Sequence, residues 1–331
     1  MPRFVVTRPY PGSNVGSNLA SLAGAAWLAR RLGRELIVDW RGMTQLRDPS
    51  LNYFTEFFET PSTIAGVVTR YAPDAGADYD GARKLHPDEA GVLASRGEDQ
   101  PDDHLVLEQY HGPARLFSGS AAARFAYLRS VYRHVAPTAD LRNAIDAWVD
   151  EHFDAPFVVG LNIRTGNGKY FGKGDAYAGR IDLSLFHKED RFLHVISRAC
   201  RRRASELPRS LRGETKIFYA TDSEPMSRLL SRLPDAVTRR QRFPPVGVGD
   251  TYAFDESDYS DRDGVADTVA DLFLLARCDA LLYNGSMFNE YARVVTGGFS
   301  GNMVNFERLF LGRRLELDAR RTWRAVRRRI G

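Results

Sequence analysis

A short run in the middle of the chain has the composition of a phosphate-binding turn. The apolar residues 157–163 predict a β-strand, and Arg164 follows them directly, just before Gly166 and Gly168. An open α/β sheet binds its ligand at the carboxyl ends of its strands, so an arginine placed there points its planar, permanently charged guanidinium at the ligand. The pattern favours a diphosphate site. A surface arginine before a glycine-rich loop is the alternative.

A second glycine-rich turn lies near the beginning of the chain. Residues 3–7 predict a strand, Gly12 and Gly16 lie in the turn, a helical apolar period runs from Leu19, and residues 36–39 predict the next strand. Small residues before a helix leave free N–H groups, which bind phosphates or sugar hydroxyls. The spacing matches neither the dinucleotide fingerprint nor the Walker loop, which disfavours a nicotinamide enzyme and a P-loop ATPase. A tight turn with Asn and Ser capping the helix would explain the same residues.

Polar residues also end two later strands. The strand 215–222 ends in Asp222, which is either a site residue or part of the capping turn of the helix that begins at Ser223. Strand 280–283 is followed by Asn284-Gly285-Ser286 and a helix, so this turn is another candidate for anion binding. The tripeptide 78–80 has the Asp-x-Asp pattern of some metal sites, but it lies in an acidic loop and is too weak to predict one.

Composition indicates a two-domain α/β protein. The chain has 331 residues, 43% of them hydrophobic, which is enough for two cores. Neither a signal peptide nor a membrane span is indicated, so we expect a cytoplasmic protein. The two cysteines, Cys200 and Cys278, lie in predicted helices without metal-ligand spacing and are expected to be buried thiols. The net charge of +4 suits an anionic ligand.

The predicted boundary between the domains is at 154–156, after helices at 121–134 and 141–152. This gives an N-terminal Rossmann-like domain of residues 1–153, a second of residues 154–310 and a basic helix of residues 311–331.

Residues 73–103 have little periodicity, which predicts a long irregular excursion such as a lid or an acceptor-binding wall. In the basic helix, Trp323, Val326 and Ile330 share one face, which favours a strap packed on the N-terminal domain. A solvated helix end and a nucleic-acid contact are the alternatives.

In their order along the chain, these motifs resemble the NodZ family of bacterial fucosyltransferases of nodulation-factor synthesis, which are related to eukaryotic core alpha-1,6-fucosyltransferases. The resemblance extends from Gly12 to about Arg293. Its motifs are residues 12–18, 36–42, 57–59, 64–67, 162–168, 220–223 and 271–278. The resemblance implies a GT-B fold of two Rossmann-like domains facing a cleft, an inverting mechanism, GDP-fucose as donor and no required metal. It also places the acceptor on the N-terminal domain and the nucleotide sugar on the second.

Position by position, the resemblance assigns roles to individual residues. Arg164 resembles the essential arginine of the family's His-x-Arg motif, which contacts the donor diphosphate, while Asn162 stands in place of that motif's histidine. Thr165 stands where the eukaryotic enzymes have a second arginine. Lys169 replaces a family carboxylate, and Asp175 and Asp182 are the nearest downstream acids for a general base. The donor-binding candidates are Gly12, Gly16, Asn18, Asn162, Arg164, Thr165, Asp222, Asp271 and Ser286, and the catalytic candidates are Arg164, Lys169 and Asp175.

We therefore predict an inverting glycosyltransferase that moves fucose or a related deoxyhexose from a GDP-sugar to a hydroxyl of a glycan or small molecule. Negative charge develops on the leaving diphosphate, and a bidentate arginine with helix N–H groups would stabilise it. We expect no cofactor, no metal, no nucleic-acid partner, no transmembrane segment and a monomer or homodimer. One alternative is a natural-product glycosyltransferase with another nucleotide sugar. The other is a non-enzymatic α/β protein that binds anions or nucleic acid.

Overall fold

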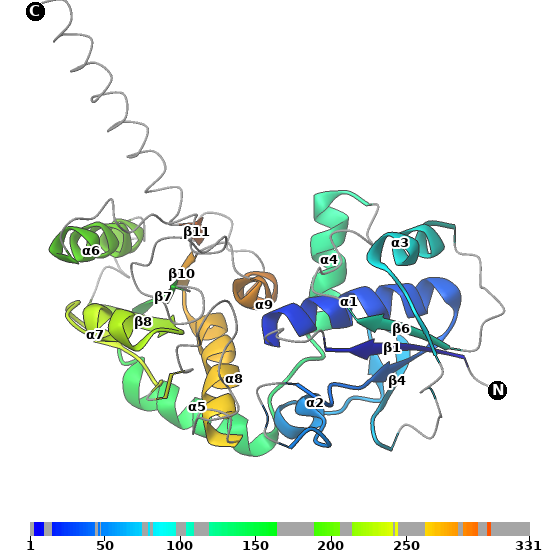
Figure 1. Ribbon diagram of the computed structural model, residues 1–331. Helices are drawn as coiled ribbons and strands as arrows, with labels where there is room; N and C mark the ends of the chain where they lie inside the picture. The colour runs from blue at the N-terminus through cyan, green and yellow to red at the C-terminus, as the bar shows by residue number, and fades with distance from the viewer. Residues whose placement is uncertain are drawn as a thin grey trace, which may run out of the picture. The chain divides into compact units, whose positions relative to one another are not determined.

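The computed structural model describes residues 3–9, 15–43, 46, 48–74, 79, 82–96, 104–108, 119–163, 189–205, 214–240, 242–243, 262–283, 287–296 and 303–305 (Figure 1). The chain divides into two compact units. The first comprises Met1–Glu151, Arg239–Arg277 and Met287–Gly298, and the second His152–Thr238, Cys278–Ser286 and Phe299–Gly331. One boundary lies close to the predicted one. The predicted assignment of residues 239–277 and 287–298 to the second domain differs from this division, because helices from these segments pack on the first unit.

The first unit is built on a largely parallel sheet with the strand order β3-β4-β2-β1-β6-β5 among the described residues. The antiparallel pair is β3 and β4; the other pairs are parallel. Its strands are β1 (Phe4–Arg8), β2 (Glu35–Val38), β3 (Thr63–Ile64), β4 (Val67–Tyr71), β5 (Arg83–Lys84) and β6 (His104–Glu108). The central strands are short apolar runs, as expected for strands buried on both faces.

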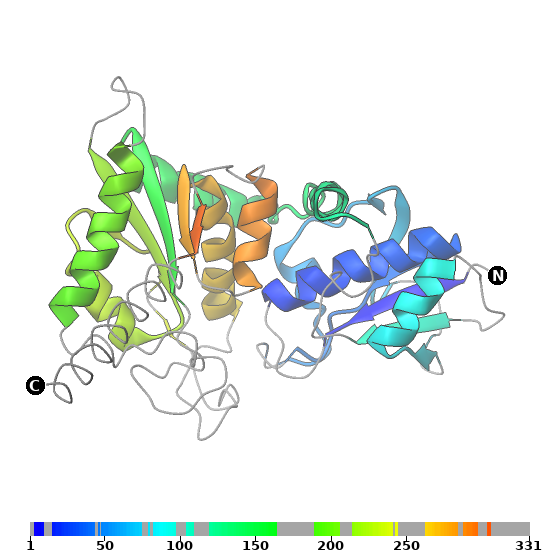
Figure 2. The same cartoon turned by 90° about the horizontal axis from the view of Figure 1, so that it is seen from above.

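The first unit also contains helices, of which α1 packs directly on this sheet. They are α1 (Val15–Leu32), α2 (Tyr53–Phe57), α3 (Pro87–Arg96), α4 (Ala121–Tyr132), α5 (Ala139–His152), α8 (Arg262–Arg277) and α9 (Phe288–Val295), with α5 ending at the start of the second unit. The buried helix α1 lies along the sheet with α3 beside it, as Figures 1 and 2 both show. Helix α9 packs on α1, α4 and α8, which explains why this late segment belongs to the first unit.

The aromatic stretch after β2 is core, as its composition predicts. Phe54 and Phe58 are fully buried and pack against the ring of Trp40. Asn52 caps α2 and also donates from its amide to the carbonyl oxygens of Val38 at 2.8 Å and Ala72 at 2.9 Å. One asparagine side chain thereby ties the helix start to the ends of two strands.

The prediction that residues 73–103 form a long irregular excursion is wrong for the part of this segment that the structure describes. Within that stretch lie strand β5 and the ten-residue helix α3. Ala90 and Leu93 of α3 are buried, but few other apolar residues accompany them. The helical period was therefore too sparse to identify against the surrounding Asp, Gly and Pro.

The second unit is a parallel sheet with the strand order β11-β10-β7-β8-β9. Its described elements are β7 (Phe157–Ile163), α6 (Glu189–Ser205), β8 (Thr215–Thr221), α7 (Glu224–Leu230), β9 (Ala236–Val237), β10 (Ala280–Tyr283) and β11 (Met303–Asn305). Alternate residues of β7, such as Val159 and Leu161, point to one face, where α6 and α7 cover them. Both sheets are of Rossmann type, so the predicted α/β class with two Rossmann-like domains is confirmed. Within the described residues, none of the helices has the length and apolar character needed to cross a membrane.

Candidate active site

The second unit has a topological switch point between β7 and β10. β7 comes first in the chain, β8 and β9 lie on one side of it, and β10 and β11 lie on the other. The connections leaving β7 and β10 consequently run in opposite directions, and open α/β sheets generally bind their ligands at the carboxyl ends of the strands at such a point. The register pairs Asn162 of β7 with Tyr283 of β10 and with Ala220 of β8, so these residues share the carboxyl edge.

The site residues predicted from the sequence surround this edge in the chain. Asn162 is the penultimate residue of β7 and is buried. Arg164 and Thr165 come directly after β7, followed later by Lys169, Asp175 and Asp182, and Ser286 comes three residues after β10. These six lie outside the described residues, as does Gly12 of the first unit. Their roles stay predictions.

Asp222 comes directly after β8, on the same edge of the sheet. The sequence left open whether it caps the next helix. The structure gives that task to Ser223, whose hydroxyl oxygen accepts the backbone N–H of Met226 at 3.3 Å. The carboxylate of Asp222 is therefore not needed as the helix cap. A nucleotide contact remains open to it.

Asp271 lies in the middle of α8 in the first unit, whereas Asn162 and Asp222 belong to the second. Its side chain is 1% exposed and its Oδ2 accepts from Nε of Arg240 at 2.8 Å. Arg240 also donates to the hydroxyl of Thr268 at 3.1 Å. Burial raises the pKa of Asp271, although the charge of Arg240 opposes this shift. Its Oδ1 is buried and makes no hydrogen bond within the described residues. A structural ion pair accounts for this residue, and its predicted contact with the nucleotide stays a prediction.

Gly16 and Asn18 lie in the first turns of α1, and both have contacts that explain them structurally. A Cβ atom on Gly16 would lie 2.6 Å from the Cα and backbone N of Phe288, which is closer than such atoms approach. Gly16 thus permits the starts of α1 and α9 to touch. Asn18 is fully buried and donates from Nδ2 to Sδ of Met43 at 3.2 Å. Their predicted donor contacts remain predictions.

The first sheet has its own switch point, between β1 and β6, and here the structure shows a polar cluster that the sequence did not reveal. The cluster consists of Arg8, Asp39, Arg41 and Tyr79. Arg8 ends β1 and pairs in register with Glu108, and Asp39 directly follows β2. Arg41 donates from Nε to Oδ1 of Asp39 at 2.7 Å and from Nη2 to Oδ2 at 3.0 Å. These parallel bonds form a bidentate pair.

Arg8 and Tyr79 complete the cluster. Nε of Arg8 donates to Oδ2 of Asp39 at 3.2 Å, and the Tyr79 hydroxyl donates to the same oxygen at 3.1 Å. The guanidinium carbon of Arg8 lies 5.2 Å from the centre of the Tyr79 ring. The Asp39 side chain is 4% exposed, but those of Arg8 and Arg41 are 23% and 35% exposed. One buried carboxylate therefore orients two arginines that still reach solvent at the carboxyl edge.

The charge state of Asp39 leads to a testable pH dependence. Burial alone would raise its pKa, but Arg41, Tyr79 and Arg8 together hold the pKa below its ordinary value of 3.8. The unfolded chain then binds more protons than the folded chain near this pH, so the stability that Asp39 contributes is complete above the unfolded pKa and is lost as the pH falls through the folded one. We expect Asp39→Asn to lower the free energy of unfolding by about 1.5–3 kcal/mol at neutral pH, the range for hydrogen bonds to charged groups.

Chemical denaturation of both proteins between about pH 5 and pH 2 tests the sign, because the difference between them should shrink as the pH falls. A difference that is constant or grows on acidification would contradict the charged cluster. Asp48→Asn is the control. The pKa of Asp48 is also lowered, but within the described residues its exposed carboxylate accepts hydrogen bonds from Ser50 alone, so its removal should change stability much less than that of Asp39.

Other reactive groups do not form a site within the described residues. No cluster of three or more His, Cys, Asp or Glu side chains there could hold a metal ion. Both cysteines are buried, as predicted, and burial raises the pKa of Cys200 to about 12. A thiol of this kind is not a nucleophile at neutral pH.

Comparison with known proteins identifies the family. The model of the family "Nodulation protein Z (NodZ)" matches residues 1–80 and 125–319. Nodulation protein Z of Bradyrhizobium diazoefficiens is 27% identical over 325 residues, covering 92% of this chain and 81% of its own. The protein of the same name from Sinorhizobium fredii is 27% identical over 311 residues, covering 88% of this chain and 90% of its own.

Solved structures agree. The crystal structure of fucosyltransferase NodZ from Bradyrhizobium matches with a TM-score of 0.59 and 25% identity, over 88% of this chain and 93% of that one. The structure of POFUT1 in complex with GDP matches with a TM-score of 0.53 at 12% identity, over 92% of this chain and 99% of that one, and so shares the fold. The resemblance found in the sequence is confirmed: the chain belongs to the NodZ family.

Proposed function

We propose that this chain is an inverting GT-B glycosyltransferase that transfers fucose, or a related deoxyhexose, from a GDP-sugar to a hydroxyl of a glycan or small molecule. The observation that carries the proposal is the switch point of the second sheet, which the Asn162-Ile163-Arg164 run reaches at the end of β7. Membership of the NodZ family supports it. A NodZ alpha-1,6-fucosyltransferase has been co-crystallised with GDP and soaked with GDP-fucose, which supports the choice of donor.

The donor is assigned to the carboxyl edge of the second sheet. As the bond from the sugar to the diphosphate breaks, positive charge builds on the sugar carbon and negative charge on the leaving oxygens. Arg164 stabilises that negative charge, and the hydroxyls of Thr165 and Ser286 supply further hydrogen bonds. Such groups accelerate the reaction because their interaction strengthens as the charge develops. Asp222 accepts from the N–H edge of the guanine base.

The acceptor is assigned to the first unit, at the cluster of Arg8, Asp39, Arg41 and Tyr79. This cluster lies at the switch point of its sheet, the general position for a ligand. Its two arginines and one carboxylate leave one positive charge, and both guanidinium groups reach solvent. The guanidinium N–H groups of Arg8 and Arg41, held in place by Asp39, can donate hydrogen bonds to sugar hydroxyls or to an acidic group on the acceptor. Asp175 is the proposed general base for the acceptor hydroxyl, and Lys169, which replaces the family carboxylate, supplies positive charge near the diphosphate.

Three further predictions belong to this proposal. The enzyme needs no metal, it is cytoplasmic, and its basic helix at 311–331 packs as a strap on the N-terminal domain. The strap lies outside the described residues and is supported by the shared helical face of Trp323, Val326 and Ile330.

The experiment that tests the donor is a thermal-shift comparison of GDP, UDP and dTDP. A ligand that binds only the folded protein raises its apparent stability by RT ln(1 + [L]/Kd), which is about 2.7 kcal/mol at a hundredfold excess over Kd. We expect GDP to give the largest shift, and Asp222→Asn to reduce the preference for GDP over UDP. Equal shifts with all three diphosphates would contradict a guanine site and favour a glycosyltransferase with another nucleotide sugar.

The matched control is Glu224→Gln, two residues further along the chain. Its carboxylate is exposed and pairs with Arg228 within α7, so its loss should leave the preference for GDP unchanged. A protein that binds GDP-fucose but transfers fucose to none of a panel of glycans and small molecules would instead support the non-enzymatic alternative.

A further inference from the structure

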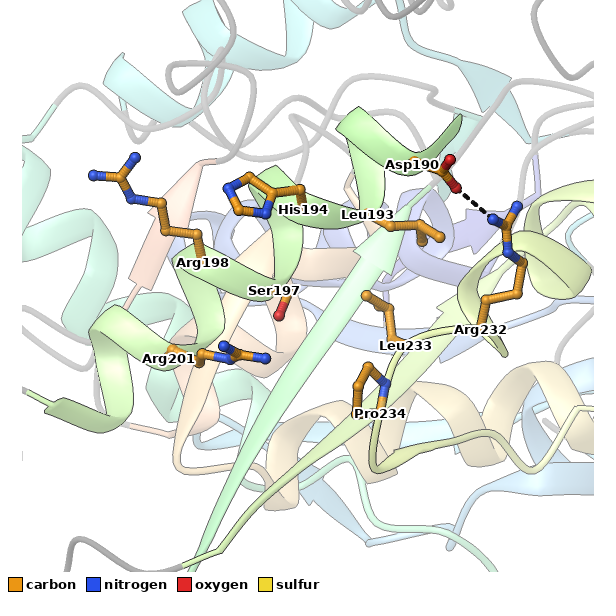
Figure 3. A pocket seen from close by; sticks show the side chains of 9 residues that line it. All are labelled: Asp190, Leu193, His194, Ser197, Arg198, Arg201, Arg232, Leu233 and Pro234. Carbon is orange, nitrogen blue, oxygen red and sulfur yellow. Dashed lines mark hydrogen bonds and ion pairs between the residues drawn. The ribbon is translucent and has the colours of Figure 1, made fainter. Parts of the chain in front are cut away.

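The second unit carries a hollow of about 430 Å³ between α6 and the segment that follows α7, separate from the proposed donor site. One wall is a single face of α6, formed by His194, Ser197, Arg198 and Arg201 at intervals of three and four residues. The other wall is the segment 232–234, just after α7. Figure 3 shows the side chains of Leu193 and Leu233 pointing toward each other in its middle. Both leucines are buried, so the hollow has an apolar floor.

The rim of this hollow is strongly basic. Three arginines line it, against a single acid, Asp190, which is paired with Arg232. Within the described part of the chain, the guanidinium groups of Arg198 and Arg201 have neither an acid nor a hydrogen-bond acceptor as partner. In Figure 3 the side chain of Arg201 turns inward beside Ser197, whereas that of Arg198 extends away from the leucines. Arg201 and Ser197 are thus the groups best placed to meet a ligand.

The position of the hollow distinguishes it from the donor edge. Asp222 precedes α7, and the segment 232–234 follows it. A seven-residue helix rises by about 10 Å, so this wall lies that far from the edge where β8 ends. A donor bound at the carboxyl ends of β7 and β10 would leave the hollow empty.

We propose that this hollow binds a phosphate monoester carried on a small organic body. A guanidinium group matches the tetrahedral phosphate in charge and geometry, and the hydroxyl of Ser197 adds a further hydrogen bond. The volume lies within the range of small-molecule sites, and the apolar floor accommodates the carbon skeleton. Such a monoester has two sources, a soluble sugar phosphate or a phosphatidic acid headgroup.

The helix itself offers the comparison that separates a site from an ordinary basic surface. Arg202 follows Arg201 directly, is also exposed, and does not line the hollow. A solvated basic face would attract phosphate equally through both arginines, because nonspecific attraction depends on net charge. Binding at a built site would depend on Arg201 and not on Arg202.

Calorimetric titration of glucose 6-phosphate into the full chain, with GDP present in excess to occupy the donor site, tests the proposal. We expect saturable binding that weakens at least about tenfold in Arg201→Ala, as expected for loss of one charge-assisted hydrogen bond. Arg201→Lys should recover part of the affinity, Ser197→Ala should lose a smaller part, and Arg202→Ala should bind like the unchanged chain. Melting temperatures measured on each variant identify any loss caused by misfolding.

A second experiment distinguishes the two sources of the monoester. It measures how much protein sediments with phosphatidylcholine vesicles that contain or lack phosphatidic acid. Binding to phosphatidic acid vesicles that depends on Arg201 and not on Arg202 assigns the hollow to a lipid headgroup. Binding of glucose 6-phosphate alone assigns it to a soluble ester. Equal losses in Arg201→Ala and Arg202→Ala, or no binding of either probe, would overturn the proposal.

Discussion

Replacing Asp271 by alanine is expected to lower the free energy of unfolding by about 3–5 kcal/mol, the range found when one partner of a buried ion pair is removed. The side chains of Asp271 and Arg240 are 1% and 6% exposed, and 2.8 Å separates their bonded atoms. Without the carboxylate, the Arg240 guanidinium would keep its hydrogen bond to Thr268 but lose the charge of Asp271 in a buried environment. Chemical denaturation followed by circular dichroism measures the loss.

The control for this variant is an exposed ion pair in the same unit. Arg277 and Asp146 are separated by 2.7 Å, but their side chains are 52% and 45% exposed. Asp146→Ala should therefore cost no more than about 1 kcal/mol. If Asp271→Ala were as stable as Asp146→Ala but lost its thermal shift with GDP, Asp271 would be a nucleotide contact, as the family resemblance implies, rather than a structural partner of Arg240.

The sequence predicted the strands of the second sheet well because their signal is local. The predicted strands 157–163 and 280–283 match β7 and β10 residue for residue. Both are mainly apolar runs with clear breaks at their ends: Pro156 and Arg164 border the first, and Asp279 and Asn284 border the second. Helix α8 shows the limit of such signals. A helix was predicted to include Cys278, but α8 ends one residue earlier, at Arg277. Its start at Arg262 was missed, because the half-buried polar and small residues there carry no clear period.

The polar cluster of the first unit shows what a single sequence hides. Asp39 is bonded to Arg8 across 31 positions and to Tyr79 across 40. Parallel pairing of β1 with β2 brings the first two together, and no local spacing encodes that pairing. Tyr79 was considered only as the middle of an Asp-x-Asp tripeptide. Residues at strand ends can be predicted from the strands, whereas their partners require the sheet order.

Gly16 illustrates how one residue type serves two explanations. A glycine in the turn before a helix was predicted to bring the backbone close to a phosphate. In the structure its missing side chain admits the backbone of Phe288 instead, from a segment more than 270 positions away. Both explanations require a residue without a Cβ at this position. The sequence pattern therefore predicts that something lies close to Gly16, but not whether it is a phosphate or the backbone of another helix.

Arg164→Ala is expected to reduce the turnover of the proposed transfer by at least about 10²–10³-fold while leaving the fold intact, the loss typical of removing one donor to a developing negative charge. Arg164 directly follows β7, at the switch point of the second sheet, and the resemblance to the NodZ family predicts that it takes the place of that family's essential arginine. The loss should appear at saturating donor, because the guanidinium binds the leaving diphosphate more strongly as its charge grows. Arg164→Lys should recover little, since an ammonium group lacks the planar pair of donors.

The experiment measures the turnover of Arg164→Ala, Arg164→Lys and Arg228→Ala against that of the unchanged chain, with saturating GDP-fucose and one acceptor that the unchanged chain uses. Arg228 lies on the exposed side of α7 and pairs with Glu224, so its replacement should leave turnover near that of the unchanged chain. Equal melting temperatures in all three variants would show that the loss is chemical and not a failure to fold. If Arg164→Ala retained near-normal turnover, the diphosphate would have to be held elsewhere, and the N–H groups at the start of the helix after Ser286 would be the next place to search.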